Sequence, residues 1–154
     1  MSRAFVKESD QDNGLLPERV ISSYPNLVTT RGLSLLETRV RALESERSTA
    51  RQINDTAVLA RIARDLRYFQ ARRESARPVA APINPDLVRF GVTVRLRLSD
   101  KTEHKFTLVG EDEADPKVGL LSFVSPLAVS LLGREIGDEV SLSGQVAQIV
   151  ALES

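Results

Sequence analysis

Two runs of apolar residues with the same helical spacing limit what this chain can fold into. The first run is Leu33, Leu36, Val40, Leu43, Arg47 and Ala50, and the second is Leu59, Ile62, Leu66, Phe69, Arg73 and Ala76. Alternating steps of three and four residues predict two amphipathic helices, each about 30 Å long at 1.5 Å per residue. Because only the segment around 52–55 separates them, we expect an antiparallel coiled-coil hairpin over residues 29–78.

The ends of both helices carry capping signals. Thr29 or Thr30 is a suitable N-cap for the first helix, and Asn54 or Asp55 for the second. Pro78 is expected to end the second helix. Two pairs are spaced for an ion pair four residues apart, Glu37 with Arg41 in the first helix and Arg61 with Asp65, in the weaker orientation, in the second.

After a linker at residues 79–86 the apolar period changes from helical to two. Alternation over 88–98 predicts a half-buried strand. The further expected elements are strands at 105–109, 119–124, 139–142 and 145–152 and a short helix at 126–132 with Ser125 as its N-cap. Residues 87–154 therefore predict a small antiparallel sheet with one short helix, and the whole chain predicts an α+β protein.

Residues 1–28 form a polar N-terminal arm in this interpretation. The first 30 residues contain charged side chains and no apolar run, so we expect no signal peptide. No apolar stretch approaches the roughly 18 residues that span a bilayer. We therefore expect a cytoplasmic location and no membrane partner.

The zero net charge of the 154 residues conceals an uneven distribution. Residues 29–78 hold eleven basic side chains, all arginine, against six acidic ones, whereas residues 79–154 hold seven basic and eleven acidic. This asymmetry favours a partner with a charged surface. Chance segregation onto two solvated faces is the alternative.

Composition excludes several kinds of chemistry. The chain has no cysteine and one histidine, His104, so thiolate catalysis and cysteine- or histidine-based metal sites are excluded. No phosphate-binding glycine motif occurs, and we expect no cofactor. The acidic run Glu111, Asp112, Glu113 and Asp115 offers oxygen ligands for a hard cation, but it lacks the spacing of a calcium loop, which favours a solvated loop.

Three stretches of the C-terminal half resemble the C-terminal domain of the bacterial Gre transcript-cleavage factors. They are the segments 108–115 and 125–133 and the pair Gly137-Asp138. The segment 28–33 also looks like the start of the coiled-coil domain of that family. The resemblance extends over residues 26–152 and is most specific in the C-terminal domain.

The resemblance implies a coiled coil followed by a domain with an FKBP-like fold. In the Gre family the C-terminal domain docks at the rim of the RNA polymerase secondary channel, and the coiled-coil tip presents carboxylates that help to hold a catalytic magnesium. RNA polymerase is therefore the expected partner, with indirect contact to DNA or RNA in the elongation complex. The expected docking residues are Val124, Ser125, Pro126 and Leu127, with the acidic loop nearby; Val124 replaces a residue that is usually polar in the family.

The tip departs from the family pattern of an aspartate, two further residues and then Glu-Asn. Asn54 and Asp55 occupy it, Asp55 is its only carboxylate, and Val58 stands three residues later. One carboxylate is too few to hold a second magnesium well. The helices also look shorter than those of the cleavage factors. The chain is closer in this respect to the Gre-like regulators, which include the regulator of nucleoside diphosphate kinase.

We therefore predict an elongation regulator that binds RNA polymerase, is not an enzyme and does not stimulate transcript cleavage efficiently. Two alternatives are an active cleavage factor that uses Asp55 and an FKBP-like binding or isomerase module. Fold alone does not carry an isomerase function. The C-terminal domain also has only three aromatic residues, Phe90, Phe106 and Phe123, with which to line a proline pocket.

Overall fold

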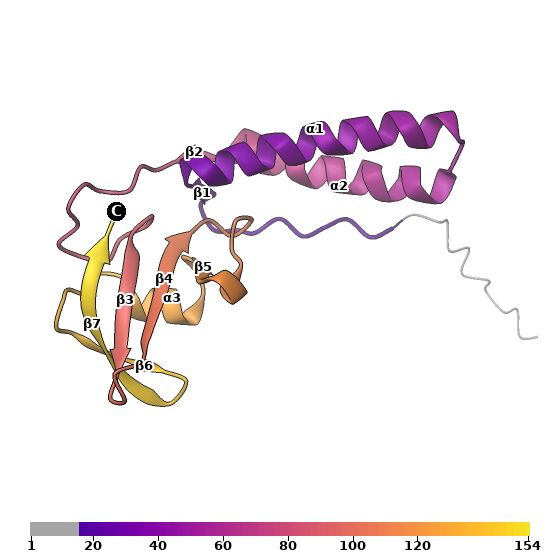
Figure 1. Ribbon diagram of the computed structural model, residues 1–154. Helices are drawn as coiled ribbons and strands as arrows, with labels where there is room; N and C mark the ends of the chain where they lie inside the picture. The colour runs from indigo at the N-terminus through magenta and orange to yellow at the C-terminus, as the bar shows by residue number, and fades with distance from the viewer. Residues whose placement is uncertain (1–15) are drawn as a thin grey trace, which may run out of the picture.

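The structure is a computed structural model, and it describes residues 16–154. The first fifteen residues of the expected N-terminal arm lie outside this part of the chain. Figure 1 shows two long helices, α1 and α2, that extend side by side away from a β-sheet and a short helix. The expectation of an α+β protein with two long helices is confirmed. No helix among residues 16–154 combines the length and apolarity needed to cross a membrane.

Helix α1 is Thr30–Gln52 and helix α2 is Thr56–Ser75, and we call them the helix pair. The Thr29 hydroxyl accepts a hydrogen bond from the Gly32 amide and so caps α1. Asp55 caps α2 in the same way, because its carboxylate accepts from the Val58 amide. The short connection between these caps makes the two helices antiparallel.

The apolar stripes form the contact between the two helices. Val40, Leu43, Ala50, Ile62 and Leu66 are buried together, with Val58, Leu59 and Phe69 packed against them. The predicted stripe is wrong at one position of α2, Arg73.

The stripe places Arg73 in the contact between the two helices, but Arg73 is exposed. The neighbouring Arg72 is buried instead, with its side chain only 2% exposed. A helix with 3.6 residues per turn drifts relative to a strict seven-residue repeat, which brings the neighbouring residue inward.

A two-residue ladder closes the base of the helix pair. Strand β1, Leu27–Val28, pairs in parallel with β2, Arg77–Pro78. Helix α2 thus ends at Ser75 rather than at Pro78, because a residue before proline disfavours helical geometry and Arg77 is extended. The start of α1 and the end of α2 are therefore held together next to the sheet (Figure 1).

The sheet has five strands in the order β5-β4-β3-β7-β6. They are β3 (Thr93–Leu98), β4 (Glu103–Val109), β5 (Leu120–Ser122), β6 (Glu139–Leu142) and β7 (Gln145–Glu153). The expectation of a purely antiparallel sheet is wrong, because β5 pairs in parallel with β4. Between these two strands the chain passes through the acidic loop and a 3₁₀ turn at Pro116–Val118, and β5 then pairs with Thr107–Val109 at the end of β4.

The first expected strand is shorter than its alternating pattern. Val88, Phe90 and Val92 are buried as predicted, yet β3 begins only at Thr93. Gly91 has a φ of +84°, which interrupts the extended backbone and is readily adopted by glycine. Alternating burial therefore extends beyond the hydrogen-bonded strand.

Helix α3, Pro126–Leu131, covers one face of the sheet and contributes Ala128 and Leu131 to its core. The sheet contributes Val94, Leu96, Leu108 and Ile149, all without exposed surface. This core fixes α3 and the segment before it on a rigid support. The helix pair lies at the C-terminal end of β4, next to the acidic loop (Figure 1).

Candidate functional site

The expected docking segment lies at the start of α3. Val124, Ser125 and Leu127 are half-buried and Pro126 is exposed. Leu127 packs against the sheet core and so anchors the segment. The segment therefore combines a fixed backbone with accessible side chains, which is the arrangement that a docking surface needs.

Ser125 occupies the predicted N-cap position, but its side chain makes no capping hydrogen bond. Its Oγ is buried and has no hydrogen-bond partner among the described residues. The predicted position is thus correct and the predicted cap is wrong. A buried hydroxyl without a partner lowers stability, so packing alone does not explain a serine here.

Three exposed apolar side chains follow the docking segment in the sequence. Val129 is 58% exposed and Ile136 is 57% exposed, and Leu132 lies between them in sequence with 38%. Apolar groups rimmed by polar ones are typical of protein–protein contact sites. These three residues were not singled out from the sequence, because their spacing also suits a helix that faces a core.

The tip of the helix pair carries the expected Asn54 and Asp55. Asn54 is exposed and has a φ of 54°, and the carboxylate of Asp55 is occupied by the cap of α2. The side chain of Ile53 is 69% exposed, and a shallow hollow of about 310 Å³ lies beside it. The tip thus exposes one apolar side chain beside polar ones and holds a single capped carboxylate, and no group of three potential metal ligands occurs within residues 16–154.

The acidic loop is not the solvated loop that the sequence predicts. Asp112 accepts a hydrogen bond from Tyr68 at 2.6 Å and from Arg72 Nε at 2.5 Å. Glu111 adds a contact of 3.6 Å to Arg72 Nη2. The prediction fails because the run faces the base of α2, where buried Arg72 supplies the opposite charge.

Burial and the bond to Asp112 change the chemistry of Tyr68. Desolvation, followed by the hydrogen bond to Asp112 and the charge of this carboxylate, raises the pKa of Tyr68 to about 12. Tyr68 therefore stays protonated and donates to Asp112 at neutral pH. This bond ties the middle of α2 to the sheet domain.

Glu113 joins the loop to the other helix. Its carboxylate accepts from the Thr29 hydroxyl at 2.5 Å and from Arg31 at 3.0 Å, and its side chain is 4% exposed. The helical Gly32 lies directly against this carboxylate, which leaves no free room for a Cβ atom. The three acids Glu111, Asp112 and Glu113 thus form a joint between the helix pair and the sheet.

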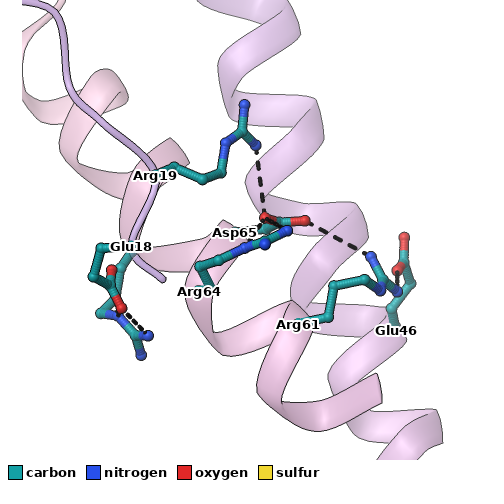
Figure 2. Close-up of polar contacts among 7 residues, drawn as sticks. Glu18, Arg19, Glu46, Arg61, Arg64 and Asp65 are labelled. Carbon is teal, nitrogen blue, oxygen red and sulfur yellow. Dashed lines mark hydrogen bonds and ion pairs between the residues drawn. The ribbon is translucent and has the colours of Figure 1, made fainter. Parts of the chain in front are cut away.

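The arginine-rich surface of the helix pair is partly neutralised. Figure 2 shows Asp65 among arginines; its side chain is 9% exposed and lies 3.0 Å from Arg64 and 3.7 Å from Arg61. The predicted Arg61–Asp65 pair is confirmed, whereas the predicted Glu37–Arg41 pair does not form within residues 16–154, where Arg41 instead donates to Thr38. Glu46 of α1 pairs with Arg61 at 3.4 Å and with Arg39 at 3.6 Å. The roles of Tyr68 and Arg72 were not predicted, because nothing local in the sequence shows that they meet the acidic loop.

Comparison with known proteins gives matches in the C-terminal half. Residues 83–152 match the family model described as "Transcription elongation factor, GreA/GreB, C-term". The "Transcription elongation factor GreA" of Desulfovibrio desulfuricans is 52% identical over 61 residues, 39% of this chain and 38% of that protein. The protein of the same name from Geobacillus kaustophilus is 50% identical over 60 residues, 38% of each chain. Each match therefore spans less than half of the relative.

Two solved structures resemble a larger part of the chain at low identity. The GreA factor homolog 1 protein of Thermus thermophilus is 17% identical, with a TM-score of 0.42 over 85% of this chain and 100% of that one. The GreA/GreB elongation factor of Nitrosomonas europaea is 23% identical, with a TM-score of 0.41 over 83% of this chain and 98% of that one.

Proposed function

We propose, from the premise that residues 83–152 are a GreA/GreB C-terminal domain, that this chain binds bacterial RNA polymerase and regulates transcription elongation. The observation that carries the proposal is the family match, which includes the whole docking segment 124–127. The relatives that match part of the chain are named transcription elongation factors. Accessible side chains on a rigid support add a physical reason for docking at this place.

The docking site that we propose on the polymerase is the rim of the secondary channel. Val124, Ser125, Pro126 and Leu127 would contact it. The exposed Val129, which lies on α3 directly after the segment, would extend the same surface.

The helix pair would act as an arm of the coiled-coil type that enters the channel. Its 23-residue α1 is about 35 Å long at 1.5 Å per residue. The proposed division is an N-terminal arm at 1–28, the hairpin at 29–78, a linker at 79–86 and an FKBP-like domain at 87–154. Contact with DNA or RNA would then be indirect, inside the elongation complex, and the cytoplasm would be the place of action.

We further propose that the chain is not an enzyme and stimulates transcript cleavage poorly. The single tip carboxylate, Asp55, is held by the Val58 amide, which limits its use as a metal ligand. Val58 stands where the resembled family carries an acid. The apolar Ile53 is better suited to contact than to chemistry.

A transcription assay on stalled elongation complexes tests this proposal. The full chain should change the rate of elongation while producing little RNA cleavage. Asp55→Asn is the informative variant, because asparagine keeps the helix cap and removes the charge. Strong cleavage by the original chain that disappears in Asp55→Asn would establish the cleavage factor instead. Unchanged elongation at saturating protein would contradict regulation.

A further inference from the structure

The segment before β1, residues 16–26, lies along α2 without forming a helix or a strand (Figure 1). We call it the strap. Among the described residues, its backbone at 16–21 makes no hydrogen bond. At its C-terminal end Asn26 is buried and donates to the Arg72 carbonyl at 2.7 Å and to the Ser75 hydroxyl at 3.1 Å. Towards its N-terminal end, two neighbouring side chains, Glu18 and Arg19, attach the strap to α2. The position of this N-terminal part therefore depends on what α2 offers to these two charges.

Glu18 forms a two-oxygen contact with Arg67 of α2. Arg67 Nε donates to both carboxylate oxygens at 3.1 Å, and Nη2 donates to one of them at 2.5 Å. The hydrogen bond from Arg67 lowers the pKa of Glu18, and the same bond raises the pKa of Arg67. This geometry is the fork-shaped recognition of a carboxylate by arginine.

Arg19 occupies the adjoining site on α2. Its guanidinium carbon lies 4.0 Å from the centre of the Tyr68 ring and 4.9 Å from that of Phe69. One of its nitrogens is 3.7 Å from Asp65 (Figure 2). Two aromatic faces and a nearly buried carboxylate together favour a cation. This face of α2 thus presents a receptor for an anion next to a receptor for a cation.

We propose that Asp65, Arg67, Tyr68 and Phe69 form a peptide-binding face, and that the strap occupies it as an internal pseudo-ligand. The face recognises an extended segment in which a carboxylate residue is followed directly by an arginine. A partner protein with such a segment would compete with Glu18 and Arg19. The inference does not depend on polymerase binding, since it concerns contacts within the free chain.

The charge pattern favours a peptide over a nucleic acid. A phosphate backbone can replace Glu18 at Arg67, but it offers no cation for the rings of Tyr68 and Phe69. Asp65 keeps Arg64 at 3.0 Å and Arg61 at 3.7 Å when Arg19 leaves, so the preference for a peptide rests mainly on the two rings. A segment with both charges satisfies all four side chains of the face.

Tethering explains how a surface contact can keep the face closed. Exposed ion pairs are individually weak, so the free segment should bind with an affinity on the order of millimolar. The strap is joined directly to β1 and acts at an effective concentration of the same order. The closed state is then the major one but exchanges readily with a competitor.

A spin label tests the closed state. The chain has no cysteine, so Val20→Cys, at a site 90% exposed, accepts a single nitroxide label. The label should broaden the amide signals of residues 64–69, and Glu18→Ala with Arg19→Ala should weaken the broadening severalfold. Glu37→Ala, an exposed charge on α1, is the matched control and should leave it unchanged. Equal broadening in all three proteins would overturn the proposal.

A peptide added in trans tests recognition itself. A peptide with the sequence of residues 16–26 should shift the amide signals of Arg67, Tyr68 and Phe69 in the Glu18→Ala, Arg19→Ala chain, and severalfold less in the original chain. The same peptide with Glu18 and Arg19 exchanged should bind severalfold more weakly. Absence of shifts at about 5 mM, an affinity range set by such weak contacts, would contradict the proposal. So would equal binding of the exchanged peptide or of a single-stranded RNA of similar length.

Discussion

Arg72 of α2 donates a hydrogen bond from Nε to the carboxylate of Asp112 across 2.5 Å, with its side chain only 2% exposed. This pair joins two residues that are 40 positions apart, one on the helix pair and one on the loop after β4. Buried charges are tolerated only when they are paired and hydrogen-bonded. The angle between the helix pair and the docking segment therefore depends on this contact.

Removing Asp112 should destabilise the protein strongly. Asp112→Ala leaves the buried Arg72 charge with Glu111 at 3.6 Å and also removes the partner of Tyr68. We expect the free energy of unfolding to fall by about 3–5 kcal/mol, the range for breaking a buried pair by removing one partner. Urea denaturation measures it. The exposed Asp86 gives the control Asp86→Ala, which should change stability by less than about 0.5 kcal/mol. Similar losses in both variants would contradict the role of the pair.

Tyr68 should lose its proton at a higher pH than an ordinary tyrosine. Tyr24→Phe leaves Tyr68 as the only tyrosine, so absorbance at alkaline pH reports on Tyr68 alone. Its pKa should be about 12, against about 10 in an unfolded chain. Because the folded state keeps the proton longer, the free energy of unfolding should fall as pH rises from about 10 to 12. In the same background Asp112→Asn should lower the pKa of Tyr68. A pKa near 10, with circular dichroism showing a folded chain, would contradict the contact.

Two capping positions should respond oppositely to alanine. Asp55→Ala removes a carboxylate that accepts from the Val58 amide, so the unfolding free energy should fall by about 1 kcal/mol. Ser125→Ala removes a buried hydroxyl without a partner, so stability should be unchanged or slightly higher. Thermal unfolding of both variants checks the contrast. A loss of about 1 kcal/mol in Ser125→Ala would show that its hydroxyl is bonded in the free protein.

The parts of the fold that follow from local pattern are predictable from the sequence. Steps of three and four residues place Val40, Leu43, Ile62 and Leu66 in the helix contact, and the structure confirms each. Alternation places Val94 and Leu96 in the sheet core in the same way. These predictions succeed because a helix or strand turns its side chains with a fixed period.

The parts that depend on distant partners are not predictable from one sequence. In the sequence alone the acidic loop looks solvated, because nothing local shows that the fold brings Asp112 to Arg72. A stripe with a strict seven-residue repeat likewise places Arg73, and not Arg72, in the buried position. The parallel pairing of β5 with β4 depends on how the chain returns after the loop. The cap at the tip could be predicted because it depends on neighbouring residues only, and Asp55 forms it.

Binding of the full chain to purified core RNA polymerase tests the central claim most directly. In a titration followed by interferometry, the chain should bind at micromolar concentration or below. Ser125→Arg should weaken binding at least tenfold, because a charged side chain replaces a buried one at the docking segment. Asp86→Arg, an exposed site outside the segment, should bind like the original chain. Absence of binding at micromolar concentration, or equal binding by Ser125→Arg and the original chain, would contradict polymerase docking through this segment.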